Sequence, residues 1–309
     1  MPKLSRHQLR QEIINLNRID SKRASYDLLL STYRRITEGL QIVVGLAGGG
    51  ELFYRVRITE HKPQKISDFQ APPSQSVLGY QRCNPPGIPM FYAASRRIVA
   101  LWETRVKKGQ VVYLSQWIAR DRIPVNRIFD SEENQEVNGQ VSTLRGPNDD
   151  VLLAYFDTQF TRKIHADFAD DYKFTAAAAQ FLTTKFRAET ERKIHIDGHV
   201  ALKYPSVFDL EVGHNTAMHA EFAKERLELL HAMELRVLES EGNSIRVEVL
   251  DTATNFEDGQ IHWTSDPSRI PALLVEERSV PFRHDGTKWN LQLWDGPVTS
   301  EYLEALLTD

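Results

Sequence analysis

Strand-like and helix-like segments follow one another in a mixed order along this chain, and residues 89–103, PMFYAASRRIVALWE, contain one of each. The beginning of this segment is typical of a strand. In its second half, Ile98, Leu101 and Trp102 share one face at helical spacing. LFYRVR at residues 52–57 is also strand-like, and ELRVLE followed by IRVEVLD indicates a hairpin. This mixed order predicts the α+β class.

The same patterns predict how the chain is organised. Residues 60–88 are rich in Pro, Gln, Ser and Gly, which favours a long loop, and the segment IDGHVALKYPSV predicts one strand ending at Pro205. We expect a helical N-terminal extension at 1–47, a central domain at 48–240 and a β-rich C-terminal extension at 241–309 packed on the core. Helices are expected within residues 5–40 and at 95–106, 151–166, 172–187, 215–231 and 299–307, and strands at 52–57, 89–94 and 110–115.

Composition excludes several classes of protein. The chain has 38 Lys and Arg against 42 Asp and Glu, a net charge of −4, which argues against a general nucleic-acid binder. Cys83 is its single cysteine, so no internal disulfide can form. No apolar run reaches the roughly 18 residues that a membrane span needs, and the N-terminus lacks a signal-peptide pattern. We therefore expect a cytoplasmic protein, with a secretion route that leaves no such signal as the alternative.

Glu103 is the one carboxylate on a helix that is otherwise apolar and basic. It lies on the flank of the predicted helix together with Val99 and Arg96, at the edge of the buried face. A carboxylate in that place can point into a cleft while its stem is packed. The plainer alternative is a surface glutamate that pairs with Arg96 or Lys107.

Three separate segments resemble one known family. LFYRVR at 52–57 is similar to its opening strand, and GYQRCNPPGIPMFYAASRRIVALWE at 79–103 is similar to its central motif. DGHVALKYPSVFDLEVGHNTAMHAE at 197–221 resembles its third motif. This family is the RES domain, named for an Arg, a Glu and a Ser. The resemblance covers roughly residues 50 to 240, so the central domain at 48–240 is expected to be the catalytic one.

The resemblance implies both a fold and an activity. RES domains resemble ADP-ribosyltransferases, with mixed central sheets and flanking helices. Many are toxins that consume NAD⁺ by phosphorolysis, hydrolysis or ADP-ribosyl transfer, and a separate antitoxin often neutralises them. Matched residue by residue, Arg55, Glu103 and Ser206 are the implied catalytic residues, and Arg82 and Tyr92 match further family positions. NAD⁺ is then a substrate, and no separate cofactor or metal is expected.

General chemistry is compatible with these roles. Cleavage at nicotinamide creates positive charge on the ribose, which one carboxylate, Glu103, can stabilise. Arginine binds a pyrophosphate through a planar fork of donors, and Arg55 and Arg82 are the candidates. Arg57 is a rival to Arg55, because the two share one face of a strand.

Three further residues have both a functional and a structural interpretation. Tyr92 is expected to contact the nicotinamide or a ribose hydroxyl, or else to be a core aromatic residue. Ser206 is expected to orient the glutamate or the nicotinamide amide, or else to cap a turn. Asn215 is expected to bind substrate, or else to cap the helix that follows it.

Two other functions remain alternatives. His195, Asp197 and His199 would point the same way on a strand and could bind a divalent metal, as in a metal-dependent hydrolase. A binding module without turnover is the second alternative. We expect NAD⁺ as a partner, together with a separate antitoxin or immunity protein and a possible homodimer, and no nucleic acid or membrane.

Overall fold

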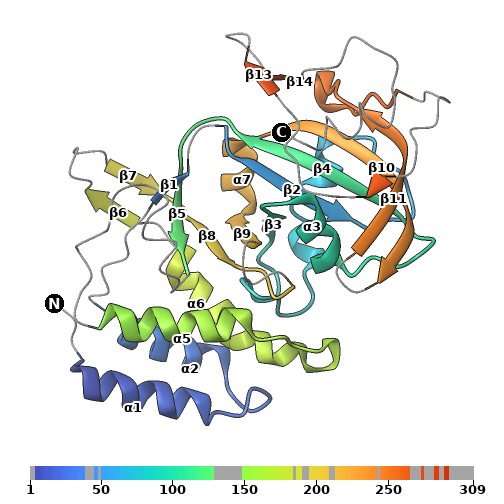
Figure 1. The fold of residues 1–309 in the computed structure, drawn as a ribbon. Coiled ribbons are helices and arrows are strands. Elements are labelled where there is room, and N and C mark those ends of the chain that lie inside the picture. Colours follow the sequence, from blue (N-terminus) through green and yellow to red (C-terminus); the bar gives the residue numbers. More distant parts are fainter. Residues whose placement is uncertain are drawn as a thin grey trace.

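Helices and strands both contribute extensively to the fold, as the α+β prediction requires (Figure 1). The computed structural model describes residues 4–38, 45–47, 50–128, 148–183, 186–189, 195–208, 213–241, 244–264, 273–274, 282–284 and 289–291. The described α-helices are α1 (Arg6–Asn17), α2 (Tyr26–Thr37), α3 (Arg97–Thr104), α5 (Asp149–Thr161), α6 (Tyr172–Thr183) and α7 (Ala220–Arg226).

The central sheet is mixed. In the described part of the chain its ten strands lie in the order β1-β5-β8-β9-β3-β2-β4-β10-β11-β12, with β5 and β8 parallel and the other neighbours antiparallel. Its strands are β1 (Gly45–Ala47), β2 (Leu52–Arg57), β3 (Met90–Ala94), β4 (Val111–Ala119), β5 (Ile123–Arg127), β8 (Ala201–Pro205), β9 (His214–His219), β10 (Leu227–Glu241), β11 (Ser244–Ala253) and β12 (Leu273–Leu274). Two small pairs lie outside it, β6 (Phe186–Glu189) with β7 (His195–Gly198) and β13 (Phe282–His284) with β14 (Trp289–Leu291).

The sheet is nearly divided between β2 and β3. Among the described residues these strands pair at a single position, Tyr54 with Ala94, whereas β2 pairs with β4 along its whole length. On one face, Phe53, Phe91 and Trp117 pack with Phe222 of α7. On the other, Tyr54 and Leu114 pack with Val99 and Leu101 of α3. The helices α3 and α7 therefore cover opposite faces of the region where the sheet divides.

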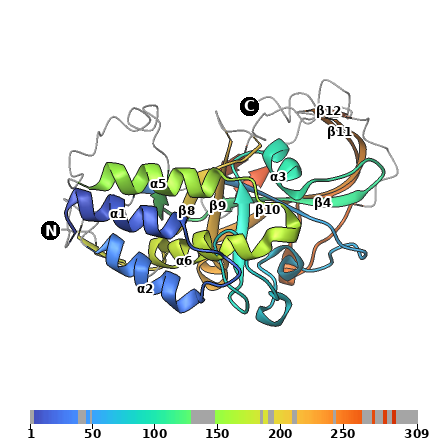
Figure 2. The same ribbon diagram turned by 90° about the horizontal axis from the view of Figure 1, so that it is seen from below.

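The predicted N-terminal helices are confirmed. Ser5 and Ser25 accept hydrogen bonds from the backbone at Gln8 and Leu28, so each helix begins with a serine cap. Both views show α1, α2, α5 and α6 grouped at one end of the molecule, away from β4, β10 and β11 (Figures 1 and 2). Their apolar faces share one core with side chains from β8 and β9.

Two predictions for the third motif are wrong. Residues 215–231 are not one helix: β9 is followed by α7 and then by β10. The strand β9 lies between β3 and β8, and both faces of its central residues are buried, so its apolar side chains do not alternate with polar ones. Hydrogen bonding of β9 to both neighbouring strands therefore outweighs the helical spacing of its apolar residues. IDGHVALKYPSV likewise forms two strands, β7 and β8, separated at His199 and Val200.

The hairpin prediction is confirmed, because β10 and β11 pair antiparallel with Glu241 opposite Ser244. The strand expected at 110–115 extends to Ala119 as β4. The helix expected at 299–307 lies outside the described residues, and the domain boundaries stay predictions. None of the described helices is both long and apolar enough to cross a membrane.

Two neighbouring leucines of α2 provide a test of this packing. Leu29 is fully buried, whereas Leu28 is 50% exposed. We expect Leu29→Ala to lower the free energy of unfolding by about 3 kcal/mol, because it leaves a cavity between α2 and α6. Leu28→Ala should change it by less than about 0.5 kcal/mol. Urea denaturation of both variants measures this, and equal effects would contradict the packing of α2 on the core.

Candidate active site

The position of Glu103 is determined by the packing of α3. Ile98, Val99 and Leu101 are buried against the sheet, which leaves Glu103 half-buried in the last turn. The helix ends directly afterwards, where Arg105 adopts a left-handed conformation with φ of 53°. Such a conformation is uncommon for a residue other than glycine. Glu103 therefore lies one residue before α3 ends at Thr104, where the backbone changes direction.

Glu103 accepts two hydrogen bonds from buried side chains. Ser206 Oγ donates to Glu103 Oε1 over 2.8 Å, and Asn215 Nδ2 donates to the same oxygen over 2.6 Å. Ser206 is fully buried and Asn215 is 7% exposed. No hydrogen bond to Glu103 Oε2 occurs among the described residues. Glu103 therefore bonds to buried side chains through one oxygen, which disagrees with the alternative of a solvent-exposed surface pair.

Two strand ends bring these donors to the glutamate. Asn215 lies in β9 opposite Ala94 of β3 and Tyr204 of β8. Ser206 directly follows β8, and its hydroxyl also accepts a hydrogen bond from the Phe208 N–H over 3.1 Å. The prediction that Asn215 caps a helix is wrong, because it is a strand residue. The Ser206 hydroxyl thus contacts both the glutamate and the turn after β8, and its role in catalysis stays a prediction.

Arg55 occupies the region where β2 and β3 separate. Its Nη1 donates to the Tyr92 carbonyl over 2.8 Å, and its guanidinium carbon lies 5.1 Å from the centre of the Phe91 ring. The Nε atom is buried and has no hydrogen-bond partner in the described part of the chain. Burial, followed by the charge of Arg57, lowers the pKa of Arg55 to about 9. The side chain therefore retains unused donor capacity.

The strand β3 connects Arg55 to Glu103. Arg55 binds the carbonyl of Tyr92, and Asn215, the partner of Glu103, lies opposite Ala94, two residues further along. Two residues of strand span about 7 Å. An arginine and a carboxylate that are far apart in sequence are thus attached to neighbouring points of one strand.

The sequence comparison agrees with this geometry. The family model described as RES domain matches residues 52–237, which include Arg55, Glu103, Ser206 and Asn215. The chain belongs to the RES domain family. No curated protein and no solved structure gives a significant match. Membership of the family supports a role related to NAD⁺ and is consistent with enzymatic processing of NAD⁺.

In this RES domain, Tyr92 anchors the loop that precedes β3. Its hydroxyl donates to Asn84 Oδ1 over 2.5 Å and accepts from the Cys83 N–H over 2.9 Å. Burial raises the pKa of Tyr92 well above its ordinary value. Asn84 is fully buried, and sequence reasoning did not single it out, although the asparagine belongs to the central RES motif. The predicted contact of Tyr92 with nicotinamide stays a prediction.

Arg82 attaches the loop that precedes β3 to the end of α5. Its guanidinium donates to the carbonyls of Phe160 over 2.5 Å and Arg162 over 3.2 Å, at the end of α5. It also lies over the Tyr172 ring, 5.3 Å from the ring centre. Arg82 thereby satisfies carbonyls that the end of α5 leaves free. A role in substrate binding stays a prediction.

The alternative metal site is described only in part. The backbone of His195 and Asp197 lies in β7, but their side chains lie outside the described residues. The His199 ring stacks on His219 at 4.1 Å, and its Nδ1 donates to the Thr183 carbonyl over 3.4 Å. Among the described residues, no three His, Cys, Asp or Glu side chains are placed to hold a metal ion. The metal hypothesis stays untested.

The Tyr92 hydroxyl is a direct test of the loop anchor. We expect Tyr92→Phe to lower the free energy of unfolding by about 2 kcal/mol, because the buried Asn84 amide and Cys83 N–H lose their partner. Tyr113→Phe is a control, since that hydroxyl makes a longer contact of 3.4 Å with Glu234 and should cost less than about 1 kcal/mol. Thermal and urea unfolding measure both, and a neutral Tyr92→Phe would contradict the anchor.

Proposed function

We propose that this RES domain cleaves the bond between nicotinamide and ribose in NAD⁺. The observation that carries the proposal is the Glu103 carboxylate, which two buried donors hold by Oε1 while Oε2 has no partner among the described residues. Arg55, attached to the same region of β3, supplies a planar donor group for the pyrophosphate.

The chemistry requires one carboxylate and no general acid. As the bond from C1′ to the nicotinamide nitrogen breaks, its electron pair leaves with nicotinamide, which becomes neutral. Positive charge then develops on the ribose, and Glu103 Oε2 is the group that stabilises it. A nucleophile, which is water, phosphate or a protein side chain, forms the new bond at C1′ and loses its proton to Glu103 or to solvent.

Ser206 and Asn215 act as positioning residues in this mechanism. A hydrogen bond to a charged group contributes roughly 1.5–3 kcal/mol. Two such bonds to Oε1 fix the carboxylate plane before substrate binds, so no reorganisation is needed as charge develops. Direct contact of Asn215 with the substrate stays a prediction.

In the cell, the proposed reaction depletes NAD⁺. The setting that fits it is a toxin or defence effector, restrained by a separate antitoxin or immunity protein. Experiments can identify both the acceptor of the ADP-ribosyl group and the inhibitor. A binding module without turnover and a metal-dependent hydrolase are the competing functions, and both predict that NAD⁺ stays intact.

Removing the charge of Glu103 tests the proposed mechanism. We expect Glu103→Gln to lower kcat for NAD⁺ cleavage by at least about 100-fold, because the amide cannot stabilise the ribosyl cation. Its melting temperature should stay close to that of the wild type, since the amide oxygen can still accept from Ser206 and Asn215. Glu225→Gln, an exposed change on α7, is the matched control. Undiminished NAD⁺ loss by Glu103→Gln would refute the role of this residue.

A second test uses pH. Asn215→Asp would place another carboxylate within about 3 Å of Glu103, and repulsion between the two negative charges would favour a proton shared by the pair. A shared proton removes the charge that the reaction needs, so kcat should fall at a higher pH than in the wild type as the solution is acidified. Ser206→Ala removes a donor without adding charge, and should lower kcat without this shift. Identical pH profiles for Asn215→Asp and the wild type would contradict the Asn215–Glu103 contact.

A further inference from the structure

Two histidines lie in contact at the end of β9 that is remote from the candidate active site. His199 lies in the connection between β7 and β8, and His219 is the last residue of β9. Their ring centres are 4.1 Å apart, and the ring planes are inclined by 36°. Four residues of strand, about 13 Å, separate His219 from Asn215, the partner of Glu103. The pair is therefore a cluster of potential metal ligands that the proposed reaction does not use.

Thr183, the last residue of α6, contacts one nitrogen of each ring. Its hydroxyl donates its single proton to the Ala179 carbonyl over 2.8 Å, so His219 Nε2 is the donor in the 3.2 Å contact with the same hydroxyl. The Thr183 carbonyl can only accept, so His199 Nδ1 donates to it over 3.4 Å. In the neutral rings the second nitrogen, His199 Nε2 or His219 Nδ1, consequently carries a lone pair and no proton.

These second nitrogens are the atoms that bind a metal ion. No hydrogen bond to His199 Nε2 or His219 Nδ1 occurs among the described residues, and both side chains are partly exposed. Burial, followed by the charge of His199, lowers the pKa of His219 to about 4, so this ring is neutral near pH 7. A histidine that ligates a metal characteristically donates its other ring N–H to an oxygen acceptor. Thr183 supplies such an acceptor to both rings.

We propose that His199 Nε2 and His219 Nδ1 bind a divalent transition-metal ion of the class that prefers imidazole, such as Zn²⁺, Ni²⁺ or Cu²⁺. Among the described residues no third His, Cys, Asp or Glu joins them, so water completes the coordination. This pair differs from the metal-binding set that the sequence suggests, because its second ligand comes from β9 and not from β7. The reaction at Glu103 does not require this ion.

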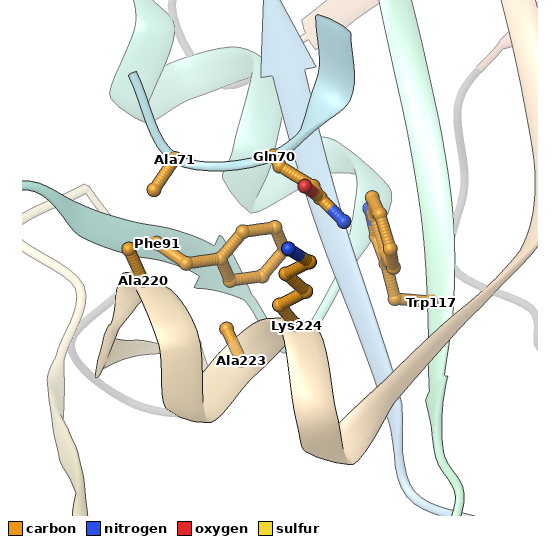
Figure 3. A pocket seen from close by; sticks show the side chains of 7 residues that line it. All are labelled: Gln70, Ala71, Phe91, Trp117, Ala220, Ala223 and Lys224. Atoms are coloured by element: carbon orange, nitrogen blue, oxygen red, sulfur yellow. The ribbon is translucent and has the colours of Figure 1, made fainter. Parts of the chain in front are cut away.

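The expected role of the ion is structural, because it joins three parts of the fold. His199 lies between β7 and β8 and is bonded to the end of α6, and His219 directly precedes α7. Figure 3 shows Ala220 and Ala223 of α7 next to the Phe91 ring of β3, so the start of this helix packs on the central sheet. An ion that binds the folded chain and not the unfolded chain raises the melting temperature.

Metal binding by the full chain, freed of any affinity tag and of metal, tests the site. Calorimetry with Zn²⁺ should show saturable binding, and His199→Gln and His219→Gln should each weaken the affinity by at least about tenfold. Glutamine retains an N–H group that can donate to Thr183. His262→Gln is the matched control, because His262 is exposed and lies outside the pair. No binding by the wild type, or equal affinity in the wild type, His199→Gln and His219→Gln, would overturn the proposal.

Electron paramagnetic resonance of the wild type with one equivalent of Cu²⁺ identifies the ligands even where a variant fails to fold. Hyperfine coupling to two imidazole nitrogens is expected, and coupling to fewer would contradict the site. Thr183→Val removes the hydroxyl acceptor of His219 and should weaken Zn²⁺ binding by about tenfold, whereas Thr183→Ser should restore it. These measurements involve no turnover of NAD⁺, so failure of the proposed function is distinguishable from failure of this inference.

Discussion

The pair of hydrogen bonds to Glu103 Oε1 is the contact on which the arrangement of the site depends. It joins the end of α3 to the ends of β8 and β9, which are more than a hundred residues away in sequence. Burying a carboxylate without partners is costly, so α3 can keep Glu103 at the edge of the core only because Ser206 and Asn215 are there to bond it. Both of these bonds go to Oε1, and Oε2 has no hydrogen-bond partner among the described residues.

The near-division of the sheet between β2 and β3 complements that contact. A fully paired β2 and β3 would bond the carbonyl of Tyr92 to the neighbouring backbone. Because the strands pair at Tyr54 and Ala94 alone among the described residues, that carbonyl accepts from Arg55 instead. The Tyr92 carbonyl of β3 therefore binds Arg55. Asn215 of β9, which pairs with Ala94 of β3, binds Glu103.

Much of the fold could be predicted, and the exceptions have physical causes. The helices at Arg6–Asn17 and Tyr26–Thr37 follow from periodicity and caps, and the hairpin of β10 and β11 from alternation. Glu103 was singled out by its place on α3, and Ser206 by the family motif. The contact of Asn215 with Glu103 could not be predicted, because β9 is buried on both faces and its pattern imitates a helix. The partners of Tyr92 and Arg82 are set by tertiary packing of the loop at 77–88, which local pattern does not encode.

The identity of the reaction products tests the central claim most directly. Purified wild-type protein would be incubated with NAD⁺, with and without phosphate, and the products identified by mass. The account predicts free nicotinamide in an amount equal to the NAD⁺ lost, together with ADP-ribose, its phosphorylated form or a modified protein. Intact NAD⁺ under every condition, or cleavage that leaves nicotinamide attached to its ribose, would contradict the assignment of Glu103 to the bond at C1′.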